Sequence, residues 1–220
     1  MSTAANSPRT ERRTQQRSLE TRAALLDAAT RAFATRGFDG ISVRQLEEQA
    51  GVKRGLVAYH FGDKDGLWRA VVDRLFAGMA ARFGDRLDVY ADLPPREAAR
   101  AVVRAFVRYS AEHPELNRLM LQECGEASWR VDYLVGEHVR PLLDGLEASV
   151  PEAYGLLYGT GRGEDAAHRY YLFVGAAAFV FSAEHECRGL FHTAPRREAF
   201  VDRHADLVTD MLIPREGEKE

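Results

Sequence analysis

Two cations and two aromatic residues lie close together after the Ala-Gly-Val tripeptide at 50–52. Lys53 and Arg54 follow this tripeptide directly, and Tyr59 and His60 come a few positions later. We expect Lys53 and Arg54 to open a helix. There the positive end of the helix dipole and the two side-chain charges would favour a phosphate group or the edge of a guanine base. The segment therefore predicts nucleic-acid binding rather than catalysis.

Two short helices joined by a tight turn are predicted to position these residues. Ser42 is a good N-cap residue, and Gln45 follows three positions later, which is the pattern of a capping box. Gly51 can take the left-handed conformation that ends the first helix, and Asp63 is a suitable N-cap for the next one. This order is typical of a helix-turn-helix, in which the second helix lies in the major groove. A helix-turn-helix corner that binds no DNA is the alternative.

The segment resembles the TetR family of bacterial transcriptional regulators. Its most specific part is the pattern AGV-x-x-G-x-x-x-YHF-x-x-K-x-x-L over residues 50–67, and the match extends from Thr21 to about Phe76. The other residues that carry the resemblance are Leu25, Leu26, Asp27, Ala28, Ala29, Phe33, Arg36, Gly37, Phe38, Ser42, Val43, Leu46 and Asp65. The resemblance implies three N-terminal DNA-binding helices, followed by an all-helical domain for ligand binding and dimerisation.

Two positions depart from the pattern of the family. Leu56 stands where a small hydroxyl residue is usual, and Ala58 stands where an aromatic residue is common. Both positions often touch the DNA backbone in the family, so the departures put those contacts in doubt and leave the fold expectation intact.

The predicted DNA-binding surface combines base-reading and phosphate-holding residues. Phosphate contacts set the register of a protein on DNA, while base contacts select the sequence. Gly55 would leave room for a close approach of the backbone. The residues expected to face the groove are Lys53, Arg54, Leu56 and Tyr59, and those expected to hold phosphates are Ser42, Arg44, His60 and Lys64.

Charge is distributed unevenly along the 220 residues, whose net charge is −3. The first 60 residues hold ten Lys and Arg against six Asp and Glu, whereas the remainder holds 20 against 27. A basic reading head on an acidic body would give this asymmetry, and chance clustering is the alternative. The two cysteines, Cys124 and Cys187, are too few for a disulfide scaffold and favour a reducing compartment.

No signal peptide is visible, and the longest nearly apolar run, 170–183, is shorter than the roughly 20 residues that span a bilayer. We therefore expect a cytoplasmic protein with no membrane partner.

The helical periodicity predicts an all-α chain of about nine helices. Residues 1–17 are expected to be a disordered basic arm that could reach an adjacent minor groove, with a solvated tail as the alternative. A helix-turn-helix domain is expected over 18–62, a helical ligand-binding and dimerisation domain over 63–213, and a charged tail over 214–220.

Several element boundaries follow from proline, glycine and apolar spacing. A first helix is expected over about 19–36, and Pro141 should kink or split the helix in which it lies. The stretch 154–164 contains four glycines and is predicted to be a loop. One long helix is expected over about 165–191 and a last one over about 195–211.

A ligand pocket is predicted between helices of the second domain, because helical bundles hold ligands there. The candidates are polar or aromatic residues near apolar faces, and ordinary core or surface roles are the alternative for each. By resemblance, a small inducer would bind among them. They are Arg118, Glu123, Cys124, Trp129, Tyr133, His138, Tyr170, Phe173, Phe181 and His185.

A dimer interface is predicted because the helix over 165–191 is apolar almost all round and must be central or at an interface. The resemblance implies that the last two helices of two protomers form a four-helix interface, and a monomer with a buried helix is the alternative. A two-fold dimer would read half-sites about 34–36 Å apart, or a multiple of that. The predicted interface residues are Phe179, Glu186, Leu190, Phe200, His204, Leu207 and Met211.

No catalytic or metal-binding pattern stands out. The seven histidines are scattered, and the densest cluster, 184–187, lacks the two-histidine spacing of a zinc protease. We expect no enzyme activity, no metal and no cofactor other than an unknown small-molecule effector. The sequence predicts a repressor that binds a palindromic operator as a homodimer and is released by an inducer. A helical interaction module with a structural helix-turn-helix, or a small-molecule enzyme in the bundle, are the alternatives.

Overall fold

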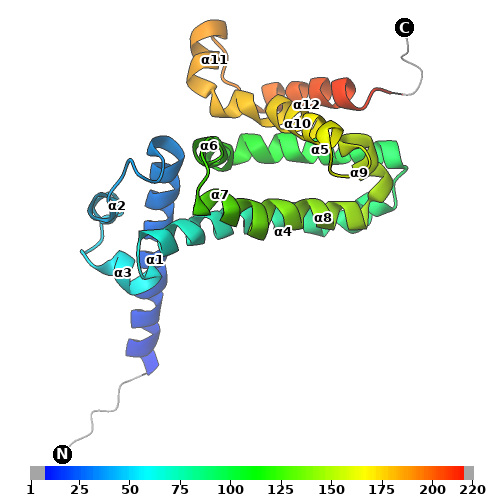
Figure 1. The fold of residues 1–220 in the computed structure, drawn as a ribbon. Coiled ribbons are helices and arrows are strands. Elements are labelled where there is room, and N and C mark those ends of the chain that lie inside the picture. Colours follow the sequence, from blue (N-terminus) through cyan, green and yellow to red (C-terminus); the bar gives the residue numbers. More distant parts are fainter. Residues whose placement is uncertain (1–7, 216–220) are drawn as a thin grey trace, which may run out of the picture. The chain divides into compact units, whose positions relative to one another are not determined.

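The computed structural model describes residues 8–215, apart from the side chains of residues 8–11, 14 and 85. Within these residues it has twelve α-helices, one π-helix and no strand, which confirms the all-α prediction and exceeds the expected number of helices (Figure 1). The chain falls into two compact units, Met1–Arg74 and Leu75–Glu220.

The units share the long helix α4. The first unit contains α1 (Pro8–Arg36), α2 (Val43–Gln49), α3 (Leu56–Phe61) and the start of α4 (Lys64–Ala91). The second contains the rest of α4, α5 (Pro95–Glu112), α6 (Pro114–Glu123), α7 (Trp129–Tyr133), the π-helix η1 (Leu134–Val139), α8 (Arg140–Ser149), α9 (Pro151–Tyr158), α10 (Glu164–Ser182), α11 (Glu184–Phe191) and α12 (Glu198–Leu212).

The first unit encloses a small core of its own between α1, α2, α3 and the first turns of α4. Leu25, Leu46 and Trp68 are fully buried, and Phe33 and Val57 are almost fully buried. Because residues such as Trp68 belong to this core, the two units divide inside α4, after Arg74, and not at the predicted position between residues 62 and 63.

The first helix begins earlier than expected. Residues 8–17 belong to α1, which corrects the prediction of a disordered arm for that part of the chain. Arg, Glu and Gln are good helix formers, and no glycine or proline follows Pro8 until Gly37. Gln16 also donates a hydrogen bond to Glu20 at 3.0 Å, one helical turn along. Residues 1–7 of the predicted arm, and 216–220 of the predicted tail, lie outside the described part.

Helix α5 is the central helix of the second unit and contacts α6, α9, α10 and α12. It begins at Pro95 and ends before the His113-Pro114 pair. Tyr109 on its buried face donates a hydrogen bond from its hydroxyl to the carbonyl oxygen of Leu75 in α4, at 2.8 Å. Burial, with a smaller contribution from Glu112, raises the pKa of Tyr109 to about 12.

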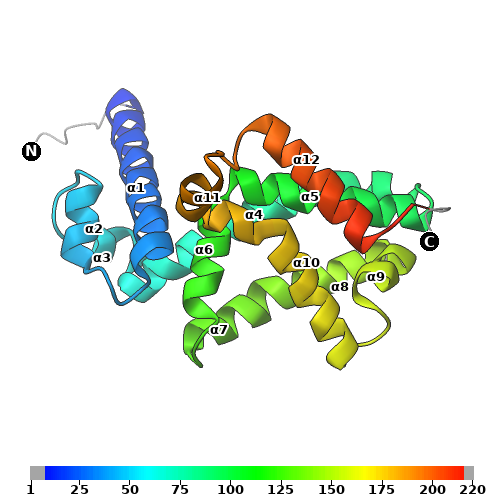
Figure 2. The same cartoon turned by 90° about the horizontal axis from the view of Figure 1, so that it is seen from above.

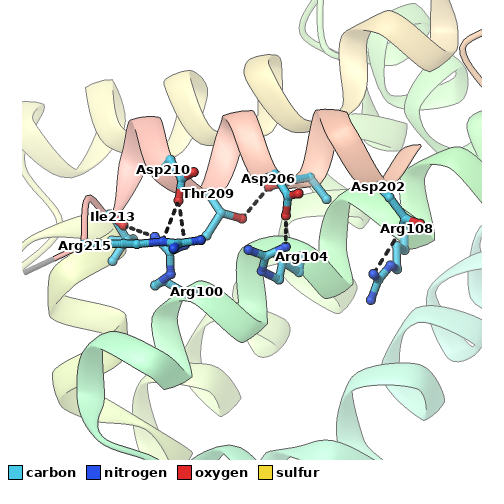
Figure 3. A network of polar contacts seen from close by, with 10 residues as sticks. Arg100, Arg104, Arg108, Asp202, Asp206, Thr209, Asp210, Ile213 and Arg215 are labelled. Atoms are coloured by element: carbon cyan, nitrogen blue, oxygen red, sulfur yellow. Dashed lines mark hydrogen bonds and ion pairs between the residues drawn. The ribbon is translucent and has the colours of Figure 1, made fainter. Parts of the chain in front are cut away.

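Helix α12 lies alongside α5 and is joined to it by a ladder of ion pairs (Figure 2, Figure 3). Residues four apart on a helix share a face, so the ladder fixes the antiparallel register of the two helices. Arg100 also donates to the carbonyl oxygen of Ile213 at 2.5 Å. The pairs are Arg100 with Asp210 at 2.6 Å, Arg104 with Asp206, and Arg108 with Asp202 at 3.0 Å.

The helix in which Pro141 lies changes its hydrogen-bond pattern just ahead of the proline, without a break in the helical backbone. Helix α7 is capped by Ser128 and runs into the π-helix η1, after which α8 begins at Arg140. The backbone N–H of Arg140 donates to the carbonyl of Val135, five residues back, which is the π-helical pattern. Pro141 has no N–H to continue an α-helical ladder across this point.

Two element predictions in the second unit are wrong. The stretch 154–164 is not a loop throughout, since α9 extends to Tyr158 and only 159–163 is irregular. Pro151 starts this helix, and Ala153 and Leu157 are buried, so packing outweighs the cost of Gly155.

The long helix expected over 165–191 is two helices, α10 and α11, separated at Ala183. Arg118 of α6 donates hydrogen bonds to the carbonyl oxygens of Phe181 and Ser182. In a continuous helix these two carbonyls would accept hydrogen bonds from backbone N–H groups four residues later. Here they accept from the Arg118 side chain instead, which favours a break in the helix. Across residues 8–215, no helix has both the length and the apolar character that a membrane crossing requires.

Candidate nucleic-acid interface

Helix α2 is capped as the sequence predicted. Ser42 has extended backbone angles and its hydroxyl accepts a hydrogen bond from the N–H of Gln45 at 3.3 Å. The Gln45 side chain in turn accepts one from the N–H of Ser42 at 2.9 Å, which completes the capping box. The capping box therefore stabilises the start of α2, where Ser42 and Arg44 are located.

The turn between α2 and α3 is longer than predicted. Gly51 and Gly55 both have positive φ, +66° and +86°, and α3 begins only at Leu56. Lys53 and Arg54 therefore lie in the turn and do not open the helix, which corrects the expectation. Glycine adopts the left-handed region at little cost, and Gly55 separates the two cations from the first helical residue. Both cations remain exposed, directly ahead of the N-terminus of α3.

Glu47 of α2 holds both ends of this turn, a role that the sequence did not reveal. Its backbone carbonyl accepts a hydrogen bond from the N–H of Val52, and its carboxylate accepts one from the N–H of Val57 in α3, each at 3.0 Å. Glu47 is only 4% exposed. Gly55 was the sequence feature that could have indicated this role of Glu47. A helix with glycine at its N-cap has no capping side chain, so its first N–H groups need a hydrogen-bond acceptor from another part of the chain.

The predicted contact residues differ in exposure. Tyr59 is 76% exposed although it is a large aromatic residue. Lys64 is half-buried, with its ammonium 4.2 Å from the centre of the Phe38 ring. His60 is half-buried beside Tyr59, at 4.9 Å between ring centres. The other exposed residues of the predicted set are Ser42, Arg44, Lys53, Arg54 and Gly55, and Leu56 is half-buried like His60 and Lys64.

The end of α3 is tied to α1. The guanidinium of Arg22 lies 5.1 Å from the centre of the Phe61 ring, a distance at which a cation and a ring attract each other. Leu56, one of the two departures from the family pattern, is half-buried at the start of α3, and Ala58, the other, is exposed.

Some predicted pocket residues come together in the second unit. Buried Glu123 pairs with Arg130 at 2.6 Å between α6 and α7. The next residue, Cys124, is exposed. Tyr170 of α10 lies beside Tyr158, with 6.2 Å between ring centres, and burial, followed by the neighbouring Tyr171, raises the pKa of Tyr170 to about 12. Phe173, one turn along α10, packs against Phe106 and Tyr158. Although Cys124 as a residue is exposed, partial burial of its thiol, followed by the charge of Glu123, raises the pKa of that thiol.

The remaining predicted pocket residues lie elsewhere. His138 stacks on Phe76 with 4.7 Å between ring centres and meets the Tyr133 ring edge-on. Arg130 also lies over the ring of Trp129. Arg118 and Phe181 lie where α6 meets the end of α10, and His185 is exposed on α11. The pocket as a set stays a prediction.

Four of the predicted dimer residues are large apolar side chains exposed on α10, α11 and α12. Phe179, Leu190, Leu207 and Met211 are each more than half exposed. An open hollow of about 370 Å³ on these helices is lined by Phe179, Val180, Ala183, Glu186, Cys187, Leu190, Phe191, Thr193 and Phe200.

His204, also in the predicted dimer set, is half-buried and its ring Nε2 lies 2.9 Å from the carbonyl oxygen of Ala176. Burial lowers the pKa of His204. Within the part of the chain that the structure describes, no group of three or more potential metal ligands is arranged to hold an ion.

A capped α2, a glycine turn with exposed cations and a short α3 define a helix-turn-helix of the DNA-binding class. Residues 25–71 match the family model described as bacterial regulatory proteins, tetR family. The repressor AcnR of Corynebacterium jeikeium is 31% identical over 134 residues, which cover 59% of this chain and 67% of that protein. The chain belongs to the TetR family.

Other relatives match over shorter stretches of the chain. AcnR of Corynebacterium glutamicum is 45% identical over 56 residues, 26% of this chain, and the match spans only 30% of the length of that relative. The solved structure of AibR in complex with isovaleryl coenzyme A and operator DNA is similar over 88% of this chain and 98% of its own, with a TM-score of 0.64 and 19% sequence identity. At that identity the likeness concerns the fold.

Proposed function

We propose that this protein is a sequence-specific DNA-binding transcriptional repressor whose operator affinity is controlled by a small-molecule effector. The observation that carries the proposal is the helix-turn-helix itself, in which Lys53 and Arg54 are exposed ahead of α3 and Tyr59 is exposed on it. Membership of the TetR family and the relatives named as repressors support it.

The two parts of the motif would do different work on DNA. Lys53, Arg54 and Tyr59 would meet base edges and the groove walls, while Ser42 and Arg44 at the capped start of α2 would hold phosphates. Each phosphate that a cation neutralises releases counterions, so binding would weaken steeply with added salt. Such a role at operator DNA would place the protein in the cytoplasm.

The proposed reader is a homodimer, with α10 and α12 as the contact. The apolar side chains exposed there, such as Phe179, Leu207 and Met211, support this interface, because large apolar patches on a soluble surface mark interaction sites. A two-fold axis would place two reading heads on one face of the duplex, about 34–36 Å apart or a multiple of that. The operator would accordingly be a palindrome.

The effector would bind in the second unit. The contacts of Phe173 with Phe106 and Tyr158, and of Tyr158 with Tyr170, support a site between α5, α9 and α10. The AibR structure holds isovaleryl coenzyme A together with operator DNA, so that compound is a first probe. Coupling between two sites is typically about 1–3 kcal/mol, enough to change operator affinity roughly 5–150-fold.

Selection of bound sequences from a random DNA pool, at one fixed moderate salt concentration, tests the proposal. We expect an enriched palindrome whose half-sites lie about one helical turn apart or a multiple of it. Weak, salt-sensitive binding with no enriched sequence would mean that the protein does not read an operator under these conditions. A repeat with protein that has been unfolded and refolded excludes a co-purified effector as the cause.

A further inference from the structure

The reading helix α3 is unusually dependent on its surroundings. It has only six residues, and an isolated helix shorter than about 12 residues is unstable in water. Its N-cap is Gly55, which has no side chain to accept hydrogen bonds from the first N–H groups. Something outside α3 must therefore fix both its formation and its direction.

Glu47 of α2 supplies a hydrogen-bond acceptor for α3 from outside that helix. The carboxylate Oε1 accepts the hydrogen bond of the Val57 N–H in the first turn of α3, across ten positions of sequence, and the Glu47 carbonyl accepts that of the Val52 N–H in the turn. Val57 is itself 1% exposed. The acceptor is therefore buried together with its donor, and water is poorly placed to replace it.

The charge of Glu47 strengthens this contact. A carboxylate at a helix N-terminus interacts favourably with the positive end of the helix dipole. A hydrogen bond to a charged group is also stronger than one between neutral groups. The same negative charge stands next to the cationic turn, where it would weaken attraction to any phosphate backbone. Glu47 would thus favour a correctly oriented α3 over general attraction to DNA.

We propose that Glu47 is the positioning residue of the reading helix, acting through α3 to set operator selectivity. It touches no DNA in this account, and the inference rests on the proposed function. Its signature is a loss of operator binding without a matching loss of non-specific binding, since non-specific binding depends on surface charge and not on the direction of α3.

Three variants with the same change in net charge separate the possibilities. Glu47→Ala removes the acceptor, Glu47→Gln keeps a carbonyl acceptor without the charge, and Glu48→Ala alters the exposed neighbour. Affinity for the selected operator and for a scrambled duplex would be measured at one salt concentration, on protein that circular dichroism shows to be folded. We expect Glu47→Ala to weaken operator binding about tenfold, about 1.4 kcal/mol, and to leave scrambled binding unchanged or slightly stronger. Glu47→Gln should recover most of the loss.

The proposal is overturned if Glu47→Ala binds the operator as the parent does. It is also overturned if operator and scrambled affinities fall together, or if Glu47→Gln gives no recovery. A Glu48→Ala variant that loses selectivity as strongly as Glu47→Ala would likewise contradict it, because charge alone would then be the cause.

Amide hydrogen exchange of the free parent and variants supplies a test that needs no operator. The Val57 N–H should exchange at least about tenfold faster in Glu47→Ala and remain protected in Glu47→Gln and Glu48→Ala. Unchanged Val57 exchange in Glu47→Ala overturns the positioning role even if the protein proves to be a repressor. If the parent shows no sequence preference on DNA while the Val57 N–H exchanges as expected in the variants, the proposed function is overturned. The role of Glu47 in positioning α3 would then still stand.

Discussion

At the residue scale, the turn before α3 is set by backbone conformation and by charge. Gly51 has a φ of +66° and a Cβ added there would meet no atom within 4 Å, so only its conformation requires glycine. Lys53 and Arg54 follow it in the exposed turn. The sequence predicted the left-handed Gly51 correctly. Gly55 is the N-cap of α3, and the room that it was predicted to leave for a close approach stays a prediction.

Gly51→Ala tests the conformational requirement. A left-handed conformation costs a residue with a Cβ about 1–2 kcal/mol, so we expect the free energy of unfolding to fall by about that amount. Gly51→Asn should lose less, because asparagine tolerates this region. Thermal or urea unfolding of the three proteins measures the difference. Equal stability of Gly51→Ala and the parent would show that the turn can adopt another conformation.

Lys53→Ala combined with Arg54→Ala tests the charge requirement. We expect the double variant to bind the operator at least about tenfold more weakly. Its binding should also depend less steeply on salt, by roughly 0.9 in the logarithmic slope for each phosphate that the variant no longer neutralises. Arg86→Ala with Arg140→Ala removes two exposed cations from the second unit and is the matched control. Operator binding as tight as that of the parent would contradict the assigned role of the turn.

At the element scale, capping residues and prolines in the sequence helped to locate helix boundaries. Boundaries that depend on packing between distant segments were not visible in the sequence. Ser42 marked the start of α2, which the structure confirms, and Pro141 marked the region where the helical hydrogen-bond pattern changes. The sequence pattern did not show the break at Ala183, because Arg118, whose hydrogen bonds favour it, is distant in sequence. Helix α9 was missed for a similar reason, since burial of its apolar residues against α5 and α10 outweighs its glycine.

The arginine and aspartate ladder between α5 and α12 gives an element-scale prediction. Hydrogen bonds from Arg104 and Arg100 lower the pKa values of Asp206 and Asp210. Because these pKa values are lower in the folded state than in the unfolded chain, the ion pairs stabilise the folded protein at pH values above the ordinary pKa of an aspartate. This stabilisation is lost as pH falls through the lowered values. We therefore expect the docking of α12 to weaken below about pH 4, which urea unfolding across a pH series would measure.

A charge exchange on the middle rung checks the register. Arg104→Asp should destabilise the protein through repulsion of Asp206, and adding Asp206→Arg should restore part of the loss. A double-mutant cycle of unfolding free energies measures the coupling. The pairs are partly exposed, so the coupling should be modest, within about 1 kcal/mol. No recovery in the exchanged protein would show that the rung does not set the register.

At the scale of the whole molecule, the charge asymmetry and the apolar surface point to separate tasks for the two units. The residues proposed to read DNA all fall in the first unit, and the proposed dimer residues all fall in the second. The sequence pattern located the residues proposed for both surfaces. It could not place the hollow on α10, α11 and α12, because that hollow arises from the break at Ala183 and joins residues of three helices.

Leu207→Lys combined with Met211→Lys tests the dimer surface. Both side chains are more than half exposed, so the fold of one protomer should survive. We expect sedimentation to show monomers and operator affinity to fall by roughly a hundredfold or more, since each half-site would then be bound alone. Val89→Lys with Leu121→Lys alters similarly exposed apolar residues elsewhere and should change neither property. A dimer that survives the α12 substitutions would move the interface to another surface.

The central claim is that a dimer reads a palindromic operator with its two α3 helices. The most direct test compares the affinity of the purified protein for two duplexes. One is the selected palindrome, and the other has the same half-sites separated by about five extra base pairs, which is half a helical turn. A dimer whose two α3 helices read one face of the duplex should bind the original strongly, with two protomers per site, and lose at least about tenfold in affinity for the spaced version. Equal affinity for both duplexes and for a scrambled one would contradict the account of a dimeric operator reader.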